Sequence, residues 1–189
     1  MKTTNQLTKW EQMMVDYGFF HQDKFNILTH LIFVPVILAS VLVPLTFLKF
    51  ANLEVSGFLV PLNAGLLAVI ALSIFYISLD KVLGWLSVPM LVLALLVATQ
   101  TSTLGFQTAG VYALIGFFGG FGVQFIGHAV EGKKPALTAY NPIVAMISSP
   151  LFVVAEYAKP FGVHKDLWEK AHKEIQRMEQ MQKTENVLA

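Results

Sequence analysis

Two short segments of this sequence gather side chains that could do chemistry. The first runs from His21 to His30 and holds Asp23 and Asn26 between its two histidines. At the pitch of a helix, Asp23, Asn26 and His30 fall within about 60° of one another on one face. His21 can join them only if it lies in a turn before that helix. The first segment therefore offers imidazole, carboxamide and carboxylate groups in one place.

The second segment holds Gln124, His128 and Glu131, which share a similar arc of a helix. Three glycines lie close to the same arc: Gly116, Gly120 and Gly127. A stripe of small residues lets two membrane helices approach closely. The face that carries Gln124 and His128 is therefore predicted to meet a neighbouring helix, not lipid.

The composition indicates what kind of protein must position these segments. Hydrophobic residues make up 55% of the chain and charged residues only 13%, whereas a soluble domain has about 25% charged residues. Between positions 27 and 130 the charged residues are Lys49, Glu54, Asp80 and Lys81. A membrane-spanning helix needs about 20 predominantly apolar residues. The sequence thus predicts an all-α, polytopic transmembrane bundle with four spans: Ile27–Leu48, Ser56–Leu79, Val82–Thr99 and Leu104–Ile126, with Gln100–Thr103 as a turn.

A fifth apolar stretch, Pro142–Ala158, is short and is interrupted by Pro150 and Glu156. Basic residues precede the first span, follow the fourth and follow this stretch. Four spans put all three basic groups on one side, which the positive-inside rule makes cytoplasmic. We therefore favour a re-entrant or interfacial segment, with a short fifth span as the alternative.

The chain divides into an interfacial N-terminal helix (1–26), the bundle (27–158) and a polar amphipathic tail (159–189), all within a single membrane domain. No cleavable signal peptide is expected at the N-terminus. Apolar stripes at helical spacing mark both ends of the chain: Leu7, Trp10, Met14 and Tyr17, then Trp168, Ala171, Ile175 and Met178. Each stripe is expected either to lie in the membrane interface or to pack on the protein's own core.

With four spans, the start of the first and the end of the fourth lie on the same side of the membrane. His21, His30, His128 and Glu131 can then converge in one layer. Three imidazoles and a carboxylate in a chain without cysteine suit Fe, Zn or Mn, and nitrogen and oxygen ligands with open positions suit ferrous iron in particular. Three further residues would orient the imidazoles: Asn26, Gln124 and Asp23.

Other functions fit the residues less well. A di-iron hydroxylase or desaturase typically has around eight histidine ligands, and this chain has 5 histidines. A transporter would place its polar groups at mid-span, whereas here they lie at span ends. A scaffold whose polar clusters only stabilise helix contacts remains open. The net charge of +1 argues against binding nucleic acid.

The sequence resembles the Mpo1-like family from about Tyr17 to Glu156. The resemblance is carried by His21, Asn26, His30 and Pro35, by the block from Gln124 through Gly-His128 to Glu131-Gly-Lys-Lys-Pro-Ala-Leu137, and by Pro150 and Glu156. One departure is Phe33, where the family often has a small residue.

The resemblance implies an iron(II)-dependent dioxygenase that uses O2 to shorten 2-hydroxy fatty acids by one carbon. It implies His21, His30 and His128 as iron ligands, Glu131 as a fourth ligand or a nearby base, and Asn26 and Gln124 as supporting site residues. The substrate's acyl tail would extend between the helices towards lipid. Lys133 and Lys134 would attract its carboxylate or only set the topology. The lack of a clear retention signal favours a bacterial inner membrane over the endoplasmic reticulum, where characterised members act.

Overall fold

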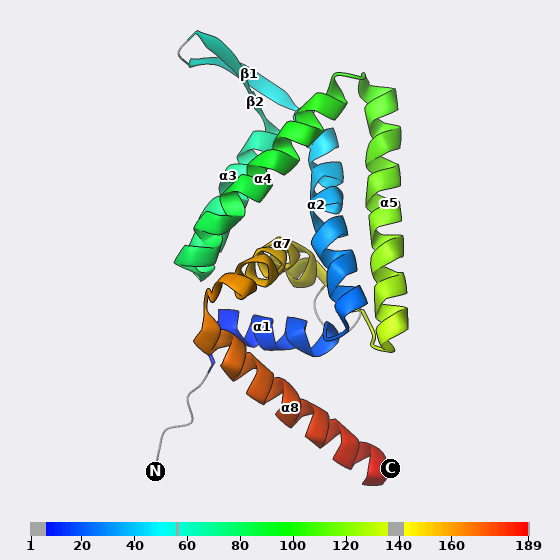
Figure 1. The fold of residues 1–189 in the computed structure, drawn as a ribbon. Coiled ribbons are helices and arrows are strands. Elements are labelled where there is room, and N and C mark those ends of the chain that lie inside the picture. Colours follow the sequence, from blue (N-terminus) through cyan, green and yellow to red (C-terminus); the bar gives the residue numbers. More distant parts are fainter. Residues whose placement is uncertain (1–6, 56, 136–141, 189) are drawn as a thin grey trace.

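The protein is mostly helical (Figure 1). A computed structural model describes residues 7–55, 57–135 and 142–188. Four helical segments are long and apolar enough to cross a membrane: α2 (Lys24–Thr46), α4 (Lys81–Ser102), α5 (Phe106–Glu131) and Pro142–Phe161, which comprises α7 (Pro142–Ala158) and the short 3-10 helix η1 (Lys159–Phe161). Helix α3 (Ala64–Leu79) is apolar but shorter. The prediction of a polytopic helical bundle is confirmed.

The predicted second span, Ser56–Leu79, is wrong in its first third. Strands β1 (Lys49–Val55) and β2 (Phe58–Asn63) pair antiparallel in a hairpin between α2 and α3, and it projects from the end of α2 far from α1 (Figure 1). Asn63 then caps α3, because its side-chain oxygen accepts a hydrogen bond from the backbone N–H of Leu66 at 2.9 Å. Apolar residues before Asn63 had the composition of a span but the local structure of a strand.

The predicted turn at Gln100–Thr103 is also misplaced. Helix α4 continues to Ser102 and Thr103 caps its end, so the turn before α5 is shorter and comes later. Thr101, Ser102 and Thr103 donate hydroxyl hydrogen bonds to carbonyls of the preceding helical turn, as Thr101 does to Val97 at 2.8 Å. Such bonds let polar side chains remain in the last turn of a helix.

The glycine stripe predicts that α5 meets a neighbouring helix, and that helix is α2. A Cβ atom on Gly127 would lie 2.6 Å from the Thr29 hydroxyl and 2.7 Å from the Asn26 side-chain oxygen, and one on Gly120 would lie 2.6 Å from Ile37. These separations are far below van der Waals contact, so only glycine allows this approach. The helix that carries His128 thereby comes against the helix that carries His30.

The terminal helices and α7 gather at the end of the bundle where α2 begins (Figure 1). Helix α1 (Lys9–Phe20) stacks Trp10 and Tyr17 on Phe152 of α7, with ring centroids 5.2 Å and 4.4 Å apart. Helix α8 (Lys165–Leu188) packs on α1, with Ile175 against Gly18. Of the two interpretations of the apolar stripes, packing on the protein therefore holds for Trp10, Met14 and Tyr17, which are buried.

Both halves of α7 contact this same end of the bundle. The Tyr76 hydroxyl, near the end of α3, donates to the Ile147 carbonyl at 2.5 Å. The Tyr157 hydroxyl donates to the carbonyl of Leu31, in the second turn of α2, at 2.9 Å. A helix that crossed the bundle from one side to the other would not contact the same end of both α2 and α3 from its two halves.

Candidate metal centre

A turn between α1 and α2 places His21 beside α2. Helix α1 ends at Phe20, and His21 caps it with φ −136° and ψ 80°, outside the helical region. Helix α2 starts three residues later, with Asp23 as its N-cap. This break meets the condition that the sequence set for His21, since a continuous helix would have turned its imidazole away from His30.

The three predicted histidines meet in one buried cluster. One ring nitrogen from each of His21, His30 and His128 lies within 4.8 Å of the others. The side chains come from the α1–α2 turn, the second turn of α2 and the last turn of α5, and all three are buried. Residues 107 positions apart in the sequence thus bring three nitrogen atoms into one group that could hold a metal ion.

Hydrogen bonds fix which nitrogen atoms face the centre. The Nδ1–H of His21 donates to the Tyr17 carbonyl at 2.7 Å, and the Nδ1–H of His30 donates to the Asn26 carbonyl at 3.0 Å. Because each neutral imidazole carries one N–H, both Nε2 atoms keep an unprotonated lone pair. These Nε2 atoms are 3.2 Å apart. Two acceptors facing each other repel, so the pair favours a cation between them and fits a metal ion.

The surroundings keep His21 neutral. Burial, reinforced by the neighbouring His30 and His128 imidazoles, holds the pKa of His21 well below its ordinary value. Tyr17 covers one face of the ring, with stacked centroids 4.0 Å apart. A neutral imidazole is the form that binds metal, so His21 needs to release no proton at neutral pH.

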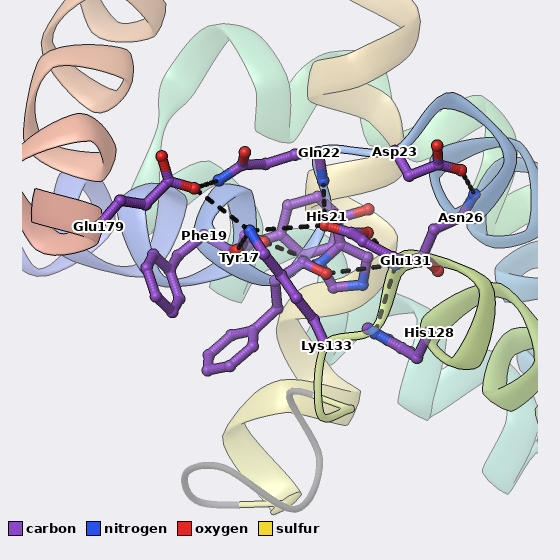
Figure 2. Close-up of polar contacts among 11 residues, drawn as sticks. Tyr17, Phe19, His21, Gln22, Asp23, Asn26, His128, Glu131, Lys133 and Glu179 are labelled. Atoms are coloured by element: carbon purple, nitrogen blue, oxygen red, sulfur yellow. Dashed lines mark hydrogen bonds and ion pairs between the residues drawn. The ribbon is translucent and has the colours of Figure 1, made fainter. Parts of the chain in front are cut away.

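Asn26 joins the cluster to Glu131 (Figure 2). Its buried Nδ2 donates to the Glu131 carboxylate at 2.7 Å and to the Phe20 carbonyl at 3.2 Å, and lies 3.3 Å from Nδ1 of His128. The other carboxylate oxygen accepts the Gln22 backbone N–H at 2.9 Å. Glu131 therefore links the end of α5 to the α1–α2 turn. Among the described residues, the group of possible metal ligands contains the three histidines and does not include Glu131.

Asp23 and Lys133 have contacts that the sequence did not predict. Asp23 was expected to orient an imidazole, but its carboxylate caps α2 by accepting the N–H groups of Phe25 and Asn26 at 2.8 Å and 3.2 Å. Lys133 donates to the Phe19 carbonyl at 2.6 Å and lies 3.6 Å from Glu131 (Figure 2). Its ammonium therefore holds the protein together at the margin of the site, whereas Lys134 is exposed.

Sequence reasoning missed two partners in this network. Gln22 and Glu179 are joined side chain to side chain at 2.9 Å, and Glu179 lies 3.6 Å from Lys133 (Figure 2). Glu179 belongs to α8, in the polar tail. A charged residue on an amphipathic tail has no local signal that would assign it to a site more than a hundred residues away.

A cavity of about 190 Å³ opens beside the histidines. It lies between α2, α3, α5 and α7, with the three histidines and Gln124 among its polar lining. Gln124 is 7% exposed, and its Nε2 has no hydrogen-bond partner among the described residues. An unpaired buried donor costs about 1–3 kcal/mol, so this amide is placed to bind an acceptor that enters the cavity.

Fold and site together define a helical membrane protein with a buried three-histidine centre at one end of its bundle. The Mpo1-like family, described as "2-hydroxy-palmitic acid dioxygenase Mpo1-like", matches residues 7–160. The chain is 32% identical over 151 residues to the 2-hydroxy-palmitic acid dioxygenase MPO1 of Saccharomyces cerevisiae, covering 77% of this chain and 78% of the yeast protein. No solved structure matches the chain. The chain belongs to the Mpo1-like family.

Proposed function

We propose that this protein is an iron(II)-dependent dioxygenase that shortens 2-hydroxy fatty acids by one carbon at the membrane. The observation that carries the proposal is the pair of unprotonated Nε2 atoms of His21 and His30, which face each other 3.2 Å apart at a cavity in an apolar bundle. The yeast relative's name supplies the substrate class, 2-hydroxy-palmitic acid.

The overall reaction needs no outside reductant. A 2-hydroxy acid and O2 give the acid that is one carbon shorter, CO2 and water. The bond between C1 and C2 breaks, C2 is oxidised from a secondary alcohol to a carboxylic acid, and C1 leaves as CO2. These changes release about four electrons, which is what the reduction of O2 to the level of water consumes. A single metal centre that binds both substrates is therefore sufficient.

The residues have distinct roles in this proposal. His21, His30 and His128 would hold ferrous iron, which supplies the open coordination positions and the redox chemistry that activate O2. Gln124 donates its free Nε2–H to the substrate's carboxylate or hydroxyl oxygen. Asn26, held by Glu131, positions His128 against the other two imidazoles. Burial by Tyr17 and α7 keeps bulk water away from the reacting carbons.

The location is proposed on the charge distribution. Lys133 contacts Phe19 and Glu131 at the histidine end of the bundle, and Lys134 follows it in the chain. Helix α8, with its basic residues, lies at the same end (Figure 1). The positive-inside rule then puts the site on the cytoplasmic side, at the depth where a fatty acid's headgroup lies. A bacterial inner membrane is our proposed host.

Metal analysis of the purified protein tests the proposal. After reconstitution with ferrous iron under nitrogen, we expect about one iron per chain, and we expect His30→Ala and His128→Ala to lose it. His172→Ala is the matched control, because His172 is exposed on α8 and contacts Gln176. A wild type that binds no iron would overturn the proposal, as would equal loss in the control.

Product analysis tests the reaction itself. The iron-loaded protein, given 2-hydroxypalmitate and O2, is expected to release pentadecanoate and CO2, both detectable by mass spectrometry. Label from ¹⁸O2 should appear in the new carboxylate. Unchanged substrate with a full complement of iron would contradict the assignment to 2-hydroxy acids.

A further inference from the structure

A second cavity lies along the same two helices as the first. It is an open groove with a volume of about 440 Å³, and among the described residues its lining comes from α2, α5 and Phe47, between Ser40 on one side and the exposed Phe106 on the other. Val41 lines both cavities. On α5, Phe121 lines the first cavity and Phe117 the second, and their ring centroids are 4.9 Å apart. The two cavities therefore adjoin at Val41 and this phenylalanine pair.

The lining residues form one continuous face on each helix. On α2 the first cavity is lined by His30, Val34, Ile37 and Val41. On α5 its lining includes His128 and Gln124. Residues three and four apart lie on the same side of a helix. The second cavity thus continues the first in a straight line away from the histidines, towards the end of the bundle that carries the β-hairpin.

Away from the histidines the lining offers no free polar group among the residues described. The Tyr76 and Ser149 hydroxyls of the first cavity donate to the carbonyls of Ile147 and Ala145, both at 2.5 Å. In the second cavity, the Ser40 hydroxyl donates to the Val36 carbonyl at 2.8 Å. An occupant that satisfies such a lining is a hydrocarbon chain.

We infer that the two cavities form one acyl channel, an inference that rests on the proposed function. Val41 separates the part of the channel that shorter tails fill from the part that only longer tails reach. From His30 to Val41, α2 rises about 16 Å. An extended chain advances about 1.3 Å per carbon from C–C bonds of about 1.5 Å, so about 13 carbons reach Val41. The tail of 2-hydroxypalmitate ends there. Longer tails enter the second cavity, where Gly110 lies about 27 Å from His128 along α5.

Two substitutions block the channel at different depths. Val41→Phe fills the junction. Gly110→Leu fills the second cavity, and a Cβ atom on Gly110 meets nothing within 4 Å. Each has a matched control that lines neither cavity. Val97→Phe adds the same ring to an exposed position of α4, and Gly119→Leu adds the same side chain to α5 at another glycine with open space.

The test compares 2-hydroxylaurate, 2-hydroxypalmitate and 2-hydroxylignocerate with protein in phosphatidylcholine nanodiscs. Val41→Phe is expected to lower kcat/KM about tenfold or more for the two longer acids and to leave 2-hydroxylaurate within about twofold. Gly110→Leu is expected to lower it only for 2-hydroxylignocerate. Both controls should keep the wild-type profile. Equal losses at all lengths, or no loss with either variant, would overturn the channel.

Binding of the radiolabelled acids to the metal-free protein separates this inference from the proposed function. If the wild type binds them and the two variants lose affinity in the same length-dependent order, the channel holds even where no acid is cleaved. If the wild type cleaves the acids while neither the binding nor the cleavage profile of the variants depends on chain length, the channel is wrong and the proposed function stands.

Discussion

At the scale of the residue, the site contains polar atoms that the protein's own groups do not pair. The Nδ1–H groups of His21 and His30 donate to backbone carbonyls, so their Nε2 atoms can only accept hydrogen bonds. Gln124 has the opposite character, because its buried Nε2 has donors and no partner among the described residues. The two facing acceptor nitrogens suit a bound cation. The free donor of Gln124 suits a carboxylate that is bound to that cation.

Gln124→Leu tests this residue. We expect kcat/KM for 2-hydroxypalmitate to fall about tenfold to a hundredfold, because the donor to the substrate is lost, with iron content unchanged. The ligand-free protein should melt at the same or a higher temperature, since an unpaired buried amide is removed. A fully active variant would mean that Gln124 does not bind the substrate. A variant that melts well below wild type would mean that Gln124 supports the fold.

At the scale of the element, the close packing of α5 on α2 brings His128 to His30. Gly127 is one residue before His128 and lies against Asn26 and Thr29. Any side chain there must separate the helices or displace Asn26, which holds Glu131. The geometry of the histidine cluster therefore depends on the close packing of α5 on α2.

Gly127→Ala is expected to lose iron and to destabilise the protein by about 1–3 kcal/mol, the usual cost of overpacking. Gly119→Ala is the matched control, because its Cβ meets nothing within 4 Å. The control should keep its iron and the wild-type melting temperature or a slightly higher one. Thermal melts and iron content of both variants make the comparison, and a Gly127→Ala protein with full iron would contradict it.

The start of α1 depends on a charged capping box that also holds α8. The Thr8 hydroxyl accepts the Glu11 N–H, the Glu11 carboxylate accepts the Thr8 N–H at 2.8 Å, and Lys170 of α8 donates to the same carboxylate at 2.9 Å. The hydrogen bond from the Thr8 backbone, helped by Lys170, holds the pKa of Glu11 below its ordinary value of 4.5.

This shift predicts a pH dependence. Because the folded-state pKa is lowered, the stabilisation is present above pH 4.5 and is lost as the pH falls through the lower folded-state pKa. Hydrogen exchange of α1 amides should therefore be slower in wild type than in Glu11→Gln at neutral pH, with the difference vanishing in acid. Glu169→Gln, whose partner Lys165 is 4.0 Å away and exposed, should match wild type throughout.

At the scale of the whole molecule, the ends of the bundle differ. The histidine end carries α1, α7, α8 and most of the charged residues, and the other end carries the β-hairpin (Figure 1). The contacts of α7 with the histidine end predict that residues before and after it lie on the same side of the membrane.

Single cysteines can test this topology without background, because the chain contains no cysteine. In sealed vesicles of known orientation, Lys134→Cys and Phe161→Cys should react with an impermeant maleimide from the cytoplasmic side, and Glu54→Cys from the opposite side. All three positions are exposed. Labelling of Phe161→Cys on the side of Glu54→Cys would mean that α7 crosses the membrane.

Hydropathy, glycine spacing and the positions of the histidines were sufficient to predict a membrane bundle, a close helix contact on the Gln124–His128 face of α5, and a layer in which His21, His30 and His128 can converge. These features follow from helical periodicity and from the number of membrane crossings, which a sequence contains. The bonds of Asn26, the capping role of Asp23, the partners of Glu131 and the hairpin before Asn63 came only from the tertiary structure. Each depends on the backbone angles of a few residues or on a contact between distant segments, and neither leaves a periodic pattern in the sequence.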